Sequence, residues 1–139
     1  ESMGAIIETP GFLDHLSGRR NLEILADLRG NLTGRDITVS LLRVGLNPGL
    51  TKPVSKYSLG MRQRLGIAQA IMEDPALLIL DEPFNGLDKH GVQEMRSLLL
   101  EEKQRGKTIL LSSHNSEDLR ILCDRIFEMD AGVMKEEIK

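Results

Sequence analysis

Two adjacent carboxylates directly follow an apolar stretch in the second half of the chain. Residues 76–80 read ALLIL, and Asp81, Glu82 and Pro83 come next. This run is too short for a helix and predicts a strand buried on both faces of a parallel sheet, where ligands bind beyond the strand ends. In a site that hydrolyses a nucleotide, one such carboxylate holds Mg²⁺ through its water shell and the next orients the attacking water. Taken alone, the pair also fits a solvated acidic turn.

Two further segments bear groups that can contact phosphate. Residues 57–64 read YSLGMRQR, with Ser58 and Gly60 at the expected start of a helix, where free N–H groups and the helix dipole attract an anion. Gly60 lets a phosphate approach the backbone closely. His114 follows the apolar run 108–111 and is expected beside Asp81, where it can donate a hydrogen bond to a phosphate oxygen. Separately, these segments also fit an ordinary helix cap and a polar loop.

The elements that must position these groups form a helical first half and an alternating second half. After a short strand at 5–7, three helices are expected: one capped by Ser17 and ended by Gly30, then 36–46 and 59–72, with a loop at 47–57. Their apolar positions at helical spacing are Leu22, Leu25, Leu28, Ile37, Leu41, Val44, Leu65, Ala68 and Ile71. The second half predicts buried strands at 76–80 and 108–111, helices at 91–104 and 115–122 (with Asn115 and Asp118 as a capping pair), and strands at 125–129 and 133–138. This order indicates a parallel α/β sheet.

Composition limits the class of protein. The chain has 139 residues, 40% hydrophobic and 28% charged, which predicts one folded, soluble domain. Its net charge of −3 gives no support to a nucleic-acid partner. The single cysteine, Cys123, cannot form an internal disulfide. No apolar run approaches the roughly 18 residues that cross a bilayer, so any link to a membrane is expected to go through a partner.

In this order and spacing, the segments resemble the ATP-binding-cassette (ABC) ATPases. YSLGMRQR is similar to the signature motif of the family, with Leu59 in place of a glycine and Met61 in place of a glutamine. Residues 77–83 match the Walker B motif, residues 85–88 (NGLD) match the D-loop, and His114 matches the switch histidine. The resemblance covers essentially all of the chain, and the combination outweighs the alternative reading of each segment.

The resemblance implies a role for each matching residue. Asp81 is expected to bind Mg²⁺ through water, Glu82 to act as the catalytic base, and His114 to contact the γ-phosphate. Two subunits of this family pair head to tail around ATP. The expected contacts with the nucleotide held by the partner subunit are those of Ser58, Gly60 and Met61, and Asp88 is expected to communicate across the interface.

A glutamine that senses Mg²⁺ usually lies near the start of this region in the family. The matching position here is Glu8, in the segment IETPG at 7–11. A carboxylate can still join the water shell of the metal, although it cannot donate a hydrogen bond unless it is protonated. Glu8 also fits a plain loop acid. The Glu-x-Pro-Gly pattern and YSLGMRQR are similar to bacterial exporters of drugs, bacteriocins and lantibiotics.

The phosphate-binding Walker A loop, Gly-x-x-x-x-Gly-Lys-Ser/Thr, does not occur in the sequence. In the family it lies upstream of the region that this chain matches. The expected fold is therefore α/β, a partial P-loop NTPase (ABC ATPase) without its Walker A part. It would comprise a Q-loop segment (1–11), a helical subdomain with the signature motif (12–74), and the C-terminal half of the catalytic core (75–139). We expect these residues alone to bind ATP poorly, not to hydrolyse it, and to self-associate through uncovered apolar surface.

The resemblance implies the ATP-hydrolysing subunit of a bacterial ABC transporter, with export as the expected direction and ATP and Mg²⁺ as cofactors. Such a subunit would lie peripherally on the cytoplasmic face of the cell membrane. Its expected partners are membrane-spanning subunits and a second ATPase subunit. Two alternatives stay open: a soluble ABC ATPase of translation or DNA repair, and a non-catalytic interaction module that only resembles the family.

Overall fold

Three parallel strands join the start of the chain to its second half. The structure is a computed structural model that describes residues 3–7 and 11–137. Its central sheet has the order β1-β2-β3, with bounds β1 (Met3–Ile7), β2 (Leu77–Asp81) and β3 (Thr108–Ser112). In the register of β2 and β3, Asp81 lies opposite Ser112. The last residues of these two strands therefore meet at one edge of the sheet.

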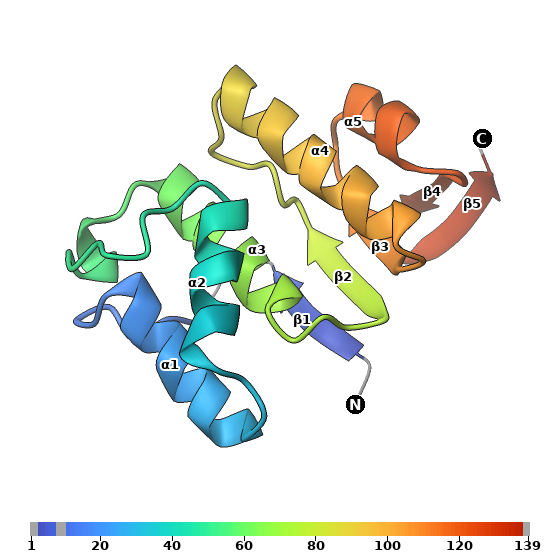
Figure 1. The fold of residues 1–139 in the computed structure, drawn as a ribbon. Coiled ribbons are helices and arrows are strands. Elements are labelled where there is room, and N and C mark those ends of the chain that lie inside the picture. Colours follow the sequence, from blue (N-terminus) through green and yellow to red (C-terminus); the bar gives the residue numbers. More distant parts are fainter. Residues whose placement is uncertain (1–2, 8–10, 138–139) are drawn as a thin grey trace.

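Helices lie on both sides of this sheet (Figure 1). The first half of the chain forms α1 (Gly18–Arg29), α2 (Gly34–Arg43), a 3₁₀ turn at Val54–Lys56, and α3 (Leu59–Ile71). The second half adds α4 (Lys89–Gln104) and α5 (Ser116–Leu122). Figure 1 shows α1–α3 gathered on one side of β2, and α4 and α5 on the other. Within the described residues, none of the helices has the length and hydrophobicity needed to span a bilayer.

Local capping signals set the helix boundaries. Ser17 caps α1 by accepting a hydrogen bond from the N–H of Arg20, and Gly30 ends this helix in the left-handed conformation, both as predicted. The second helix begins two residues earlier than the predicted start at residue 36. Thr33 and Asp36 form a reciprocal capping box that fixes its first turn.

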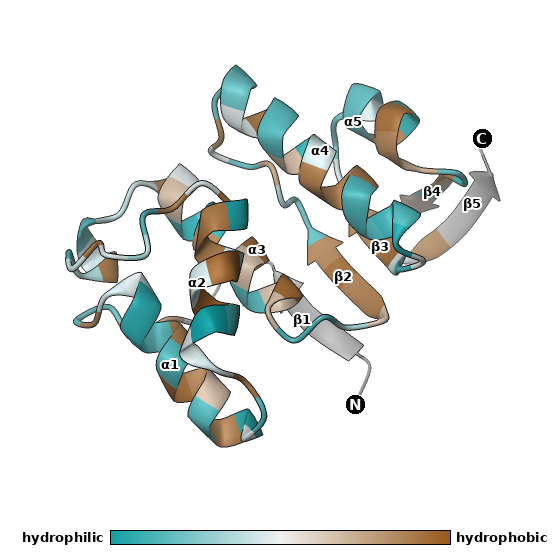
Figure 2. Cartoon of the chain, viewed as in Figure 1, coloured by the Kyte–Doolittle hydropathy of each residue, from teal (hydrophilic) through white to brown (hydrophobic). Residues whose placement is uncertain are grey.

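The outer strand is more exposed than its sequence predicts. Leu78 and Leu80 of β2 are buried, and Figure 2 shows most of this strand as hydrophobic. The prediction that 108–111 is fully buried is wrong, because Leu110 on β3 is 63% exposed. Successive side chains of a strand point to opposite faces, and only the face of β3 that carries Ile109 and Leu111 packs against the core. Self-association through such surface stays a prediction.

A separate hairpin follows the central sheet. β4 (Phe127–Asp130) and β5 (Val133–Glu137) pair antiparallel, close to the two predicted strands. Ala131 and Gly132 both have positive φ angles, 51° and 79°. This is the backbone that a two-residue hairpin turn of type I′ requires.

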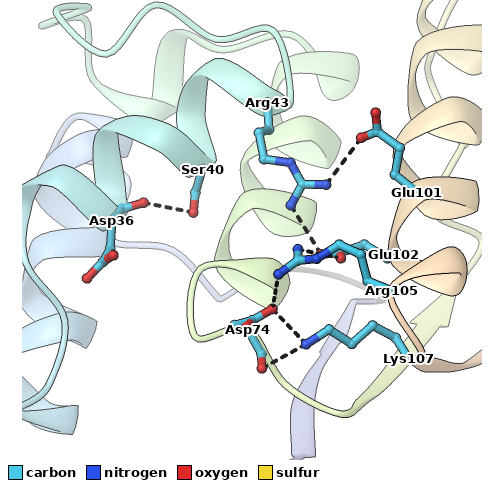
Figure 3. A network of polar contacts seen from close by, with 8 residues as sticks. All are labelled: Asp36, Ser40, Arg43, Asp74, Glu101, Glu102, Arg105 and Lys107. Atoms are coloured by element: carbon cyan, nitrogen blue, oxygen red, sulfur yellow. Dashed lines mark hydrogen bonds and ion pairs between the residues drawn. The ribbon is translucent and has the colours of Figure 1, made fainter.

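A network of charged side chains joins α2 and the turn after α3 to α4 and the residues that follow it (Figure 3). At its centre is Glu102 of α4, which is only 1% exposed and pairs with Arg43 of α2 at 3.1 Å and with Arg105 at 3.0 Å. Arg105 and Lys107 also pair with Asp74, in the turn between α3 and β2, at 3.1 and 2.6 Å. Because a buried carboxylate left without partners is costly, this network holds α2 and α4 together.

Asp74 should make the stability of the chain depend on acid pH. The hydrogen bond from Lys107, together with the positive charges of Lys107 and Arg105, lowers the pKa of this carboxyl below its ordinary value although partial burial opposes the shift. A lowered folded-state pKa stabilises the fold above the unfolded-state value, and this stabilisation is lost as pH falls through the folded-state value. We therefore expect Asp74→Asn to cost at most about 1 kcal/mol at neutral pH, and less as pH falls below about 4.

Urea unfolding across this pH range measures the effect. Asparagine tolerates the positive φ of 54° at position 74, so the substitution removes the charge without a new backbone cost. The control is Asp27→Asn on α1, because Asp27 is exposed and makes no salt bridge among the described residues. A difference between wild type and Asp74→Asn that grows on acidification would contradict the prediction.

Candidate active site

The end of β2 places the first carboxylate of the predicted pair against the neighbouring strand. Asp81 is the last residue of β2 and is half-buried. The hydroxyl of Ser112, the last residue of β3, donates a hydrogen bond to Oδ1 of Asp81. A carboxylate has further lone pairs, so this bond leaves Asp81 able to accept from metal-bound water. The sequence placed Ser112 in the segment Ser112-Ser113-His114 that follows this strand, but assigned no role to its hydroxyl.

The main chain of Glu82 has an unusual conformation that three hydrogen bonds stabilise. Its φ is 47°, in the left-handed region, which costs a non-glycine residue about 1–2 kcal/mol. Its N–H donates to the carbonyl oxygen of Ser112 at 2.9 Å. Its own carbonyl oxygen accepts from the N–H of Asn85 at 3.2 Å and from Nε2 of Gln63 at 3.1 Å. A strained backbone conformation that several hydrogen bonds hold in place is common at functional sites.

The side chain of Glu82 meets the predicted histidine. Oε1 of Glu82 and Nδ1 of His114 are in direct contact. The His114 side chain is 97% exposed and that of Glu82 is 35% exposed, so both face solvent. The parallel pairing of β2 and β3 thus brings together Asp81, Glu82 and His114 at one edge of the sheet, as the sequence led us to expect.

The chemistry of these groups fits Mg²⁺. Two carboxylates and a hydroxyl supply hard oxygen atoms, and Mg²⁺ in phosphate-transfer sites is held by one or two carboxylates together with water and substrate phosphates. Among the described residues, no group of three or more His, Cys, Asp or Glu side chains is arranged to hold a metal ion by itself. Asp81 is therefore one candidate ligand in a site that water and phosphate would complete.

The signature segment forms the first turn of α3 and packs against the D-loop. Ser58 is the N-cap, and its Oγ accepts from the N–H of Met61 at 3.1 Å. A Cβ atom added at Gly60 would lie 3.0 Å from the carbonyl oxygen of Gly86. A side chain at position 60 would therefore be tight against the D-loop, and the backbone at Gly86 would have to shift by a few tenths of an ångström. Among the described residues, Ser58 makes no hydrogen bond with Asp81, Glu82 or His114.

The remaining predicted site residues have local roles or lie outside the described part. Asp88 is the N-cap of α4, and its Oδ1 accepts from the N–H of Gly91 at 2.7 Å. Because of this cap, α4 begins two residues before its predicted start at residue 91. Glu8, the predicted Q-loop residue, lies outside the described residues.

The predicted capping pair at the start of α5 is only partly formed. Asn115 caps α5, but the side chain of Asp118 does not complete the predicted pair, because it accepts from Nε of Arg96 on α4 at 2.9 Å.

An open pocket of about 460 Å³ lies between the D-loop, α4 and the start of α5. Glu82 is part of its wall, together with polar side chains such as Asn115, so the pocket gives solvent access to the candidate base.

Gln63 is a site residue that sequence reasoning missed. Its side chain is 3% exposed and reaches the carbonyl oxygen of Glu82. The two arginines beside it in YSLGMRQR suggested a solvated stretch. Its helical spacing from Ile67, which is buried, was the available signal.

Comparisons with known proteins agree with the resemblance that the sequence motifs indicate. The sequence model described as "ABC transporter" matches residues 1–85. A bacitracin transport ATP-binding protein of Enterococcus faecalis is 49% identical over 137 residues, which cover 98% of this chain and 44% of that protein. A lantibiotic transport ATP-binding protein of Streptococcus pyogenes is 42% identical over 124 residues, which cover 89% of this chain and 54% of that protein. The chain thus spans about half the length of these curated relatives.

A solved structure agrees with the fold. The dimeric structure of a bacterial ABC transporter cassette superposes with a TM-score of 0.88 at 20% identity, covering 99% of this chain and 63% of that one. This likeness confirms the expected partial P-loop NTPase fold of α/β class.

Proposed function

The chain belongs to the ABC transporter family, and from this we propose that its parent protein hydrolyses ATP to drive transport across a membrane. One observation carries the proposal: two adjacent carboxylates at the end of β2 meet a hydroxyl and a histidine from the end of β3. Oxygen ligands for a metal and an acid–base pair are the groups that phosphoryl transfer to water needs.

We assign the roles as follows. Asp81 would hold Mg²⁺ through its water shell, and the charge supplied by a bound metal would offset the negative charge of the phosphates. Glu82 accepts a proton from the attacking water, and its fixed backbone directs the carboxylate toward that water. His114 contacts the γ-phosphate, and its contact with Glu82 supports this assignment because one carboxylate can orient the ring.

The signature segment is proposed to act on the nucleotide of a second subunit. Ser58, Gly60 and Met61 supply the first turn of α3, whose N–H groups and dipole favour an anion. The D-loop, with Asp88, lies in the same surface because Gly60 packs on Gly86. The solved cassette of similar fold is described as dimeric, which supports a pair of subunits. The head-to-tail arrangement of this pair is proposed on the family resemblance alone.

The identity of the transported molecule is proposed from the relatives. Two of them are described as bacitracin and lantibiotic transport ATP-binding proteins, which supports a bacterial transporter of such peptide antibiotics. Export as the direction is proposed on the resemblance of the sequence motifs alone. We propose that membrane-spanning subunits carry the substrate, that the parent protein binds them at the cytoplasmic face, and that residues 12–74 form the helical subdomain that meets them. Glu8 is proposed to take the Q-loop position on the resemblance alone.

Phosphate release by the purified full-length protein tests the proposal. We expect ATP hydrolysis that requires Mg²⁺ and stops when EDTA removes the metal. Full-length protein that binds Mg-ATP but releases no phosphate, with or without its membrane partner, would contradict the catalytic role.

The 139 residues alone are expected to bind Mg-ATP weakly, because their sequence contains no Walker A loop to surround the phosphates with N–H groups and a lysine. Titration calorimetry should give a dissociation constant of about 1 mM or weaker, which corresponds to about 4 kcal/mol of binding free energy. The full-length protein is the control. Micromolar binding by the 139 residues would contradict the prediction.

A further inference from the structure

A buried glutamine links the signature helix to the backbone of the proposed base. Gln63 lies in the second turn of α3, the helix that Ser58 caps. It is one of the few buried polar side chains of the described chain, and its Nε2 donates to the carbonyl oxygen of Glu82 at 3.1 Å. The two residues are 19 positions apart, so the bond joins two elements that the sequence does not hold together.

The bond is not needed to satisfy the carbonyl group of Glu82. That oxygen already accepts a hydrogen bond from the N–H of Asn85, within the turn after β2. A buried carbonyl with one partner is adequately paired. An apolar side chain at position 63 would also fill the space without the cost of burying an amide. The amide therefore adds a constraint, from a separate helix, on a peptide whose conformation is strained.

We propose that Gln63 is a positioning residue that holds the Glu82 carboxylate in its productive direction and couples it to the signature segment. The φ of 47° at Glu82 sets the direction of its Cα–Cβ bond, and so where the carboxylate points. A shift of α3, such as one caused by phosphate at its first turn, is transmitted through Gln63 to the peptide of Glu82. This inference rests on the proposed function, because it assumes that Glu82 is the base.

Gln63→Met in the full-length protein tests the inference, since methionine has a similar length and volume but cannot donate the hydrogen bond. We expect kcat for ATP hydrolysis to fall by about 10- to 100-fold, because small misplacements of a reacting group have such effects. The KM for ATP should change less than about threefold, since Gln63 is buried and its amide is directed to the main chain of Glu82. Gln104→Met on exposed α4 surface is the matched control and should leave both constants unchanged.

The double variant separates positioning from a general structural role. If Gln63 acts through Glu82, adding Gln63→Met to Glu82→Gln should not lower the residual rate further. Rates are expressed per molecule that binds ATP, so a partly unfolded preparation does not imitate the effect, and Gln63→Leu provides a second variant should Gln63→Met fold poorly.

The possible failures are distinguishable. Wild-type protein that does not hydrolyse ATP, or Glu82→Gln that hydrolyses it at the wild-type rate, would contradict the proposed function. A slow Glu82→Gln variant beside a fully active Gln63→Met variant would overturn the inference alone. The inference would also be overturned if Gln63→Met lowered the rate by the same factor in the wild-type protein and in the Glu82→Gln variant.

Discussion

Replacing Glu82 with glutamine in the full-length protein is expected to stop ATP hydrolysis while ATP binding remains. Glutamine keeps the length and shape of the side chain but cannot accept a proton from water at neutral pH. Loss of a positioned general base lowers a rate by about 10²- to 10⁴-fold. The surrounding structure should persist, because the three backbone hydrogen bonds of residue 82 do not involve its carboxylate.

Single-turnover phosphate release and equilibrium ATP binding measure the two parts of this prediction. Glu128→Gln is the control, because Glu128 is an exposed carboxylate on β4, in the separate hairpin. If Glu82→Gln retained the wild-type single-turnover rate, Glu82 could not be the base, and His114 would become the candidate for proton transfer. A loss of ATP binding would indicate that the carboxylate supports the metal instead.

Sequence patterns predicted the helices and strands well where the determining contacts are local. Ser17, Ser58 and Asn115 each cap a helix by contacting N–H groups two or three residues ahead, so their roles are visible in a short window. The exposure of Leu110 has no such local cause. The run TILL fixes a strand, but burial depends on which elements cover each face, and that is set by distant parts of the chain.

The residues of the candidate site also fall into two groups, those that local sequence patterns reveal and those that depend on contacts between distant parts of the chain. Asp81, Glu82 and His114 could be placed together from sequence, because an apolar run ends directly or within three residues before each of them and parallel strands align their ends. Gln63 could not be placed, because its partner is a main-chain carbonyl, and every residue offers one. The close packing of Gly60 on Gly86 could not be predicted from the sequence either, since it depends on how α3 packs against the D-loop.

Gly60→Asp in the full-length protein is expected to lower ATP hydrolysis by about 100-fold or more. If Gly60 lines a phosphate site, aspartate adds a negative charge where the phosphate must lie, and a lost phosphate-stabilising group costs about 10²–10³ in rate. Its Cβ would also approach the carbonyl oxygen of Gly86 to 3.0 Å, which requires the D-loop to move. An acid in the first turn of a helix is itself favourable, so α3 should remain folded.

Gly34→Asp is the matched control, because Gly34 lies in the first turn of α2 and an added Cβ would meet only Nη2 of Arg19, at 3.6 Å. This variant should keep the wild-type rate of phosphate release. Equal losses in the two variants would point to a general effect of acid at helix starts and not to the signature segment.

Mixing two inactive variants decides whether the signature segment acts in trans. In a head-to-tail pair, each site combines Glu82 of one subunit with Gly60 of the other, so a dimer of one Gly60→Asp and one Glu82→Gln subunit contains one intact site and one doubly altered site. Random association of equal amounts should then restore about a quarter of the wild-type rate if the two sites act independently. If both residues served the nucleotide of their own subunit, every site would be damaged and mixing would restore nothing. Recovery of phosphate release on mixing therefore requires that Gly60 and Glu82 meet across a subunit interface. If the two sites act independently, its absence from a confirmed heterodimer would place both residues in one subunit.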